Sequence, residues 1–177
     1  MEKAGEAGSG VSKEEYSRLL AHYPTHLMAI VKLAYHTVLR QQEIMALTWG
    51  QVEQKGGFIH LRPEDAKTNE GQSVPLHPEI IETLKGLPRG LPGVRVFTYK
   101  GSSVSCLKKS FATACRKAGI EDFTFHDWGH TATTNWRLQG YDYLRIMAAS
   151  DHQTMSVFKR YTTVSKDELK ALVGEKI

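Results

Sequence analysis

The pattern of apolar and polar positions predicts helices in the N-terminal part of the chain. Ser12 and Glu15 form the S-x-x-E signature of a capping box, and apolar residues follow it at helical spacing. A second amphipathic pattern begins after Pro24–Thr25, and a third, shorter helix is expected within residues 40–47, RQQEIMAL. Three helices are therefore expected before the pattern changes.

The next segment alternates apolar and polar residues instead. It reads WGQVEQKGGFIHLRPEDAKTNEGQSVPLHP and is interrupted around Gly56–Gly57 and again around Asn69–Gly71. Alternation broken by such turns predicts a three-stranded antiparallel meander, with Lys67 at its second turn. Pro78 then suits the first turn of another helix.

Helical patterns return in the C-terminal half. The segment SVSCLKKSFATACRKAGI, residues 103–120, predicts one amphipathic helix. Shorter helices are expected over 127–138, 142–149, 154–162 and 166–173. The predicted fold class is α+β, mainly α-helical with a small three-stranded antiparallel sheet.

Composition and charge narrow the class of protein. The 177 residues are 41% hydrophobic and 24% charged, which suits one domain with a full core. No apolar run reaches the ~20 residues that cross a bilayer, and residues 1–11 lack the apolar stretch of a signal peptide. We expect 1–11 to be a disordered leader or linker remnant. The net charge of +4 favours a polyanionic partner without establishing one.

The two cysteines point to neither a zinc knuckle nor a disulfide. Cys106 and Cys115 fall in one predicted helix, where the helix holds their Cα atoms too far apart for a bridge. We expect both to be buried small hydrophobic residues in a reducing compartment.

Five polar residues are candidates for chemistry. They are Arg40, Lys67, His126, His152 and Tyr161. Taken alone, each has an ordinary structural explanation, such as a surface ion pair, a solubilising turn residue, a helix-start residue or a core aromatic. Their sequence context decides between these explanations and a shared site.

Four segments surround these residues and occur in this order along the chain: AYHTVLRQQEIMALTWGQV, AKTNEGQSVPLHP, FHDWGHTAT and SDHQTMSVFKRY. Together they resemble the catalytic domain of the tyrosine recombinases, the phage integrase family. The first resembles the box around that family's first arginine, here Arg40, and the second resembles its β-hairpin with Lys67. The third resembles its histidine–aspartate box at 126–130. The fourth resembles the histidine that precedes the nucleophile, here His152 and Tyr161.

The resemblance implies a metal-free transesterification of DNA without a cofactor. Arg40 would clamp the scissile phosphate, and Tyr161 would attack it to form a 3′-phosphotyrosyl link. Lys67 would give a proton to the departing 5′-oxygen. His126 would activate the tyrosine or donate to the phosphate, and His152 would hydrogen-bond a non-bridging oxygen.

The resemblance also implies supporting residues and partners. Glu43 would orient the arginine region, while Asp127 and His130 would support their own box. Double-stranded DNA is the expected partner, together with other recombinase protomers in a tetramer on DNA and a monomer in isolation. Candidate contacts to the DNA backbone are basic residues: Lys108, Lys109, Arg116, Lys117, Lys159 and Arg160.

The expected domain is an integrase-type catalytic domain over 12–177, with the family's N-terminal core-binding domain absent. Its C-terminal helix, with Leu169 and Leu172, would dock on a neighbouring protomer or on its own domain. A cytoplasmic, nucleoid-associated protein of a bacterium, phage or mobile element is implied.

The sequence departs from the family pattern at three positions. Gly129 stands where the second clamp arginine is expected, Asp151 where a glycine precedes the third-box histidine, and Val38 where a glycine is usual. We therefore expect a recombinase that is impaired as written. An introduced substitution, a natural degenerate copy, or a second cation from Arg137 or Arg145 would each account for Gly129.

Two other functions remain open at this stage. A non-catalytic DNA-binding relative is favoured by Gly129. A metal hydrolase is suggested by His126 and His130, which lie at i,i+4 as in H-E-x-x-H proteases. Position 127 is aspartate, however, so the glutamate that such a protease uses as general base is missing.

Overall fold

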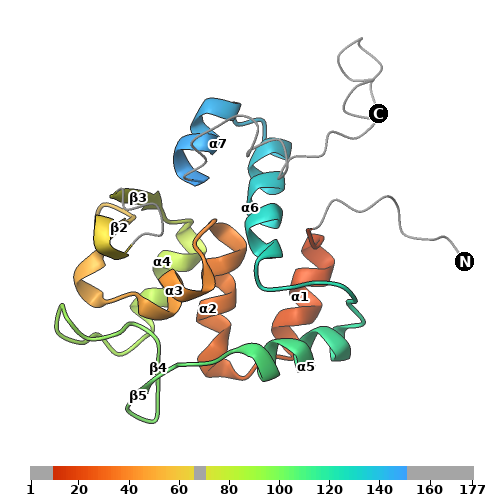
Figure 1. Ribbon diagram of the computed structural model, residues 1–177, viewed down its shortest axis with the longest axis horizontal. Coiled ribbons are helices and arrows are strands. Elements are labelled where there is room, and N and C mark those ends of the chain that lie inside the picture. The colour runs from red at the N-terminus through yellow and green to blue at the C-terminus, as the bar shows by residue number, and fades with distance from the viewer. Residues whose placement is uncertain (1–9, 66–70, 151–177) are drawn as a thin grey trace, which may run out of the picture.

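The computed structural model describes residues 10–65 and 71–150, in which several helices pack together with a small sheet at one side (Figure 1). In chain order the elements are α1 (Lys13–Ala21), α2 (Thr25–His36), α3 (Gln41–Ala46), β1 (Val52–Glu53), β2 (Phe58–Leu61), β3 (Gln72–Pro75), α4 (Pro78–Lys85), β4 (Thr98–Tyr99), β5 (Ser102–Ser103), α5 (Lys108–Ala118), α6 (Asp127–Leu138) and α7 (Tyr143–Ser150). Short 3-10 turns occupy Trp49–Gln51 and Pro63–Asp65. This confirms the predicted mainly helical α+β class.

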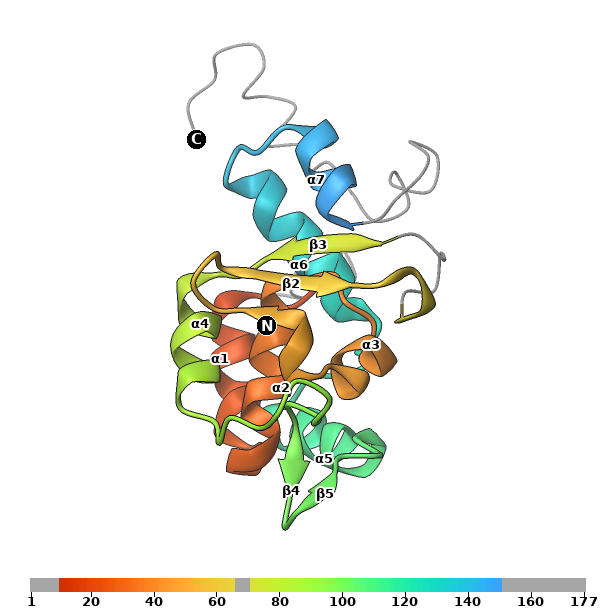
Figure 2. The ribbon, with the colours of Figure 1, turned by 90° about the vertical axis from the view of Figure 1, so that its left-hand side faces the viewer.

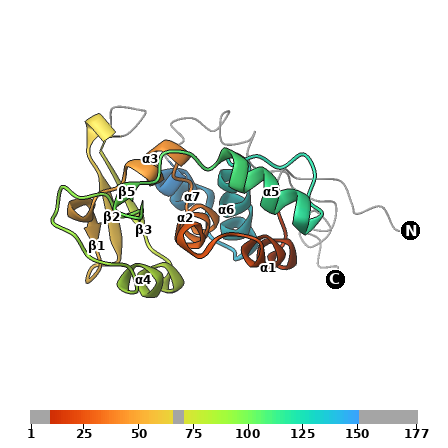
Figure 3. The same ribbon diagram turned by 90° about the horizontal axis from the view of Figure 1, so that it is seen from below.

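Helix α2 is the central element of the core. Its sequence, THLMAIVKLAYH, is apolar on most sides, and Ile30, Leu33 and Ala34 have no exposed surface. A helix that is apolar nearly all round must be covered on nearly all sides, and α1, α3, α4 and α6 pack against it. Figure 3 shows α2 between the sheet on one side and α1, α5 and α6 on the other. The segments on either end of α2 are therefore held firmly.

The predicted start of α1 is confirmed by its capping box. The Ser12 hydroxyl accepts the Glu15 N–H at 3.2 Å, and the Glu15 carboxylate accepts the Ser12 N–H at 2.8 Å. Both bonds satisfy N–H groups that a helix start leaves without partners.

The predicted meander is also confirmed. β1, β2 and β3 are antiparallel in that order, with Ile59 paired to both Val52 and Val74. Ile59 and Val74 have no exposed surface, so one face of the sheet is fixed against the core. The edge strand β3 lies beside α7, as Figure 2 shows.

The predicted helix over 103–120 is wrong at its N-terminal end. α5 begins at Lys108, because the preceding backbone belongs to a hairpin: Ser103 pairs with Thr98, and the Val104 N–H donates to the Phe97 carbonyl. Lys100 and Gly101 turn this hairpin with positive φ angles of 51° and 79°. The backbone groups of this hairpin bond to each other, so they do not form the helical hydrogen bonds that the amphipathic pattern predicts.

Cys106 lies in the stretch between that hairpin and α5 and is exposed, so its predicted burial is wrong. Cys115 lies within α5 and is buried as predicted. The helix predicted over 127–138 is confirmed, and the one predicted over 142–149 starts at Tyr143. The helices predicted over 154–162 and 166–173 lie outside the described residues. None of the described helices is long and apolar enough to span a lipid bilayer.

Candidate active site

Arg40 is held at the start of α3 by a nearby carboxylate. Its backbone N–H donates to Glu43 Oε2 at 2.7 Å, and its Nη1 donates to Glu43 Oε1 at 3.2 Å. Glu43 is 8% exposed whereas the Arg40 side chain is 40% exposed. A guanidinium carries five N–H donors, so a group orientated by one buried oxygen keeps donors for an anion in solvent.

The turn between α2 and α3 is fixed as well. The Thr37 hydroxyl is buried, donates to the Leu33 carbonyl at 2.7 Å and accepts the Leu39 N–H at 3.4 Å. Because these bonds lie directly before Arg40, the backbone that presents the guanidinium has little freedom.

A second group of candidate residues lies at the start of α6. The Asp127 carboxylate accepts both the backbone N–H and the hydroxyl of Thr124, each at 2.6 Å. These bonds hold Thr124 against the first turn of α6, where a carboxylate also interacts favourably with the helix dipole. His126, just before the helix, is exposed, and its ring lies perpendicular to that of His130 with centroids 6.0 Å apart.

His130 is half-buried, unlike His126. Burial lowers its pKa, the Asp127 charge opposes that shift, and the nearby His126 adds to it. The net effect keeps the His130 imidazole neutral near pH 7. Zinc binding by this pair needs further ligands, and among the residues described the one group of three ligand-type side chains lies elsewhere.

Gly129 lies in the first turn of α6 with open space around it. A Cβ at this position would meet no atom of another segment within 4 Å, so a side chain can begin here without a clash. Arg137 lies eight residues further along the same helix, about 12 Å away along its axis. Arg145 donates to Asp142 at 3.1 Å. Neither arginine stands where the side chain of residue 129 would begin.

Trp128 joins these two groups of residues. Its side chain is 1% exposed, and its ring packs edge-on against Tyr35 at 6.0 Å and against Phe123 at 4.9 Å. Tyr35 lies near the end of α2, shortly before Arg40, while Trp128 directly follows Asp127. The contact thus fixes the end of α2 against the start of α6. The pattern H-D-W-G-H did not single out Trp128, although a large aromatic residue between polar ones is a core signal.

Three of the five candidate catalytic residues, Lys67, His152 and Tyr161, lie outside the described residues. The described ends next to them are connected, because Gln72 Nε2 donates to the Ala149 carbonyl at 2.9 Å. Gln72 begins the strand after the Lys67 segment, and Ala149 lies just before the His152 segment. That bond ties together the described ends of two distant stretches of sequence.

Four of the candidate DNA contacts are described. Lys108, Lys109, Arg116 and Lys117 all lie on α5 and are exposed. Lys159 and Arg160 lie outside the described residues. The exposed residues give α5 a basic outer side next to the apolar side that packs on α1.

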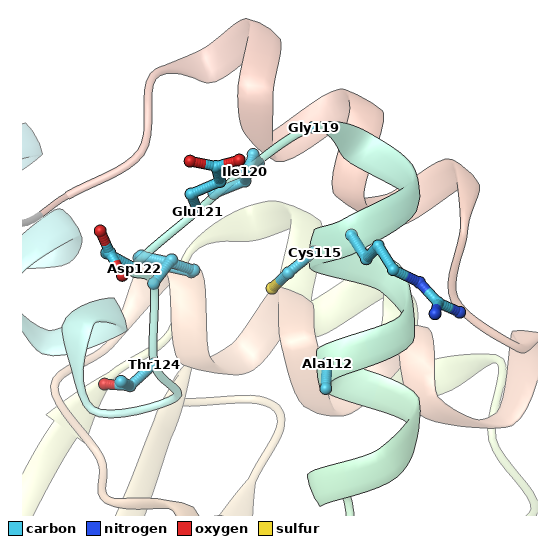
Figure 4. Close-up of a pocket in the computed structure, with 9 residues that line it drawn as sticks. Ala112, Cys115, Gly119, Ile120, Glu121, Asp122 and Thr124 are labelled. Carbon is cyan, nitrogen blue, oxygen red and sulfur yellow. The ribbon is translucent and has the colours of Figure 1, made fainter.

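A cavity of about 480 Å³ lies at the C-terminal end of α5 (Figure 4). The carboxylates of Glu121 and Asp122 lie on one side of it, and Cys115 faces it from the helix. Arg116 also lines the cavity, but the two carboxylates outnumber its single positive charge, so the cavity does not favour a phosphate.

A larger cavity, of about 1010 Å³, lies between α1, α2, α4, α6 and α7. His36, His77 and Glu79 line part of its wall. Sequence patterns do not reveal this group, because His36 ends α2 while His77 and Glu79 lie at the start of α4, and the three share no motif.

Comparisons with known proteins agree with one another. The model of the Phage integrase family matches residues 10–168. The chain is 36% identical over 137 residues to the shufflon-specific DNA recombinase of Escherichia coli, covering 77% of this chain and 34% of that protein. It is 28% identical over 170 residues to the integrase of Salmonella phage P22, covering 88% of this chain and 43% of that protein.

Solved structures share the fold. The XerA recombinase superposes with a TM-score of 0.78 at 20% identity, covering 97% of this chain and 65% of that chain. The catalytic domain of bacteriophage HP1 integrase gives 0.68 at 22% identity and covers 94% of both chains. XerH recombinase bound to its palindromic difH substrate, in a post-cleavage complex, gives 0.70 at 19% identity, covering 94% of this chain and 52% of that chain. The chain spans about a third to two fifths of the length of the two curated relatives.

Proposed function

The chain belongs to the phage integrase family, and from that premise we propose that it cuts and rejoins duplex DNA at a specific site through Tyr161. The tyrosine oxygen attacks the scissile phosphorus, the bond to the 5′-oxygen breaks, and a 3′-phosphotyrosyl link forms. The link keeps the energy of the phosphodiester bond, so a free 5′-hydroxyl of another strand reverses the step without a cofactor.

The observation that carries this proposal is the arrangement of Arg40 on Glu43. Charge gathers on the non-bridging phosphate oxygens during the attack, and a fixed guanidinium stabilises it. Arg40 is orientated by a buried carboxylate and remains partly exposed. It is therefore suited to bind a phosphate that arrives from solvent.

The remaining roles follow the same chemistry. Lys67 gives its proton to the departing 5′-oxygen, and His152 hydrogen-bonds a non-bridging oxygen. His126 is exposed at the start of α6 and donates to the phosphate or assists the tyrosine. Asp127 holds the helix start and His130 supports the same turn.

Gly129 makes the proposed reaction slow. A second arginine there would add a full positive charge to the phosphate site, and a Cβ at this position meets no neighbouring atom within 4 Å. Loss of one such donor costs on the order of 10²–10³ in rate. We propose that the chain is impaired as written and that Gly129→Arg restores much of the rate.

Binding of DNA by this chain rests on phosphate contacts from the basic side of α5. Such contacts make affinity fall steeply with salt. On the DNA the protein acts together with other protomers of the same kind.

The test uses a nicked suicide DNA substrate that traps the covalent intermediate. The parent chain, Gly129→Arg, Gly129→Ala and Tyr161→Phe are compared for the rate of adduct formation. We expect a slow adduct from the parent and from Gly129→Ala, an adduct about 10²-fold faster from Gly129→Arg, and none from Tyr161→Phe. Equal, fast trapping by the parent and Gly129→Arg would reject impairment, and an adduct with Tyr161→Phe would reject the nucleophile.

A non-catalytic DNA-binding relative is the second candidate, favoured by the glycine at position 129. It predicts a gel shift with DNA and no covalent adduct, even for Gly129→Arg. The suicide substrate therefore separates the two functions in one assay.

A further inference from the structure

Three ligand-type side chains meet where the C-terminal end of α2 faces the first turn of α4. His36 Nε2 lies 3.0 Å from Glu79 Oε2, and the rings of His36 and His77 stack with centroids 4.1 Å apart. One donor atom from each of the three residues lies within 4.8 Å of the other two. Two imidazoles and a carboxylate so close together form a typical donor set for a transition metal.

We propose that His36, His77 and Glu79 bind a divalent transition-metal ion such as Zn²⁺. Zinc holds nitrogen and oxygen ligands at about 2.0–2.2 Å, so neighbouring ligands of a tetrahedral site lie roughly 3.4 Å apart. The His36–Glu79 pair is already near that separation. To bind one ion, the two rings must rotate out of their parallel stack so that both direct an in-plane nitrogen at it; the exposed His77 has two side-chain torsions for this movement.

The contact between His36 and Glu79 suits this role, because His36 Nε2 lies 3.0 Å from Glu79 Oε2. A neutral ring donates Nε2–H to the carboxylate, and a metal ion replaces this proton as the bridge between the same two atoms.

His77 must give up a helix cap to bind the ion. Its Nδ1 accepts the Glu79 N–H at 3.2 Å. Ligation through Nδ1 takes that lone pair directly, and ligation through Nε2 moves the ring proton onto Nδ1. Either route loses the cap, so the site is weaker than one built from three free ligands.

Neighbouring residues orientate Glu79, and a cavity gives an ion access to the group. Lys32 Nζ lies 3.0 Å from Glu79 Oε1, which orientates the carboxylate and leaves Oε2 for the ion, while its charge weakens binding. The group lines the cavity of about 1010 Å³. Tyr16 lines the same cavity, and its buried hydroxyl has no hydrogen-bond partner in the described part of the chain.

The test is calorimetric titration of the metal-free full chain with Zn²⁺, in the absence of DNA. His36→Gln keeps a side-chain donor for Glu79, and His77→Asn keeps an acceptor at the helix start, where asparagine is a favoured cap. His22→Ala removes an exposed histidine outside the group and is the matched control. We expect one ion per parent chain, binding about tenfold weaker or more in both group variants, and no change in the control.

Circular dichroism of each metal-free variant checks that it is folded. If His36→Gln does not fold, the affinity of His77→Asn for Zn²⁺ tests the proposal. Unchanged affinity in the group variants, or no binding by the parent, would overturn the proposal. Weaker binding in His126→Gln alone would place the ion at the other histidine pair. Because the assay contains no DNA, its failure leaves the proposed recombinase function untouched.

Discussion

Both carboxylate oxygens of Glu43 are bonded to Arg40, one to its backbone N–H at 2.7 Å and the other to its guanidinium at 3.2 Å. One buried side chain thus starts helix α3 and orientates the side chain proposed to clamp the phosphate. The ion pair joins residues i and i+3, as do many surface pairs, but its acidic member is 8% exposed. Because the Glu43 carboxylate is buried, we expect this pair to contribute more to stability than an exposed surface pair.

Glu43→Ala is expected to lower the free energy of unfolding by about 1 kcal/mol, because the first turn of α3 loses its cap. Urea denaturation measures the change. The matched control is Glu82→Ala, which removes the acidic member of another i,i+3 pair, with Lys85, whose side chains are 71% and 55% exposed. That control should change stability by no more than about 0.5 kcal/mol. Equal losses in the two variants would mean that the Glu43 carboxylate acts as an ordinary surface charge.

Gly129→Ala is expected to stabilise the protein by about 1 kcal/mol, because glycine is a poor helix former and the new methyl group meets no neighbour. The matched control is Gly140→Ala. Gly140 is equally open but has a φ of +85°, which alanine adopts only with strain, so this change should destabilise the protein by about 1 kcal/mol or more. Thermal unfolding of the parent and the two variants shows whether each substitution raises or lowers the stability. A destabilising Gly129→Ala would show that the start of α6 requires glycine.

The sequence predicted most of the helices and the meander, because capping residues and periodicity are local signals. It failed for the segment before Lys108, which was predicted to be helical: the hairpin of β4 and β5 takes backbone bonds up to Val104, and α5 begins only at Lys108. Periodicity alone carries no information about such competition.

For the candidate site too, local motifs were predictable from the sequence, whereas contacts between distant residues were not. Motif spacing singled out Arg40, Glu43 and the box at 126–130, and the structure gives their local contacts. The packing of Trp128 on Tyr35 was not predicted, since it joins residues far apart in the chain. The group of His36, His77 and Glu79 was missed for the same reason. Lys67, His152 and Tyr161 stay predictions.

Stability should fall as the pH is lowered below about 6.5, and two histidines carry this effect. Burial lowers the pKa of both His36 and His130 below the ordinary value of 6.5. The unfolded chain therefore binds more protons than the folded one in this range, and by linkage the free energy of unfolding rises with pH. The stabilisation is complete above pH 6.5 and is lost as the pH falls through the lowered values.

The double variant His36→Gln/His130→Gln is expected to flatten the stability curve between pH 7 and about 5.5. Urea denaturation at several pH values measures the slope for parent and variant. His22→Ala, which removes an exposed histidine, serves as the control and should keep the parental slope. An unchanged slope in the double variant would assign the pH dependence to other groups. Below this range Glu79 contributes, because hydrogen bonds from Lys32 and His36 outweigh its burial and lower its pKa.

The two cysteines should react with Ellman's reagent at very different rates. Cys106 is exposed, whereas Cys115 is buried in α5 and burial raises the pKa of its thiol, so little reactive thiolate forms. In the native protein at pH 8 we expect one thiol to react quickly and the second only as the structure opens. Cys106→Ser should abolish the fast phase, and Cys115→Ala should abolish the slow one. In urea both thiols of the parent should react together. Equal native rates would mean that the end of α5 opens readily and that Cys115 is not part of a stable core.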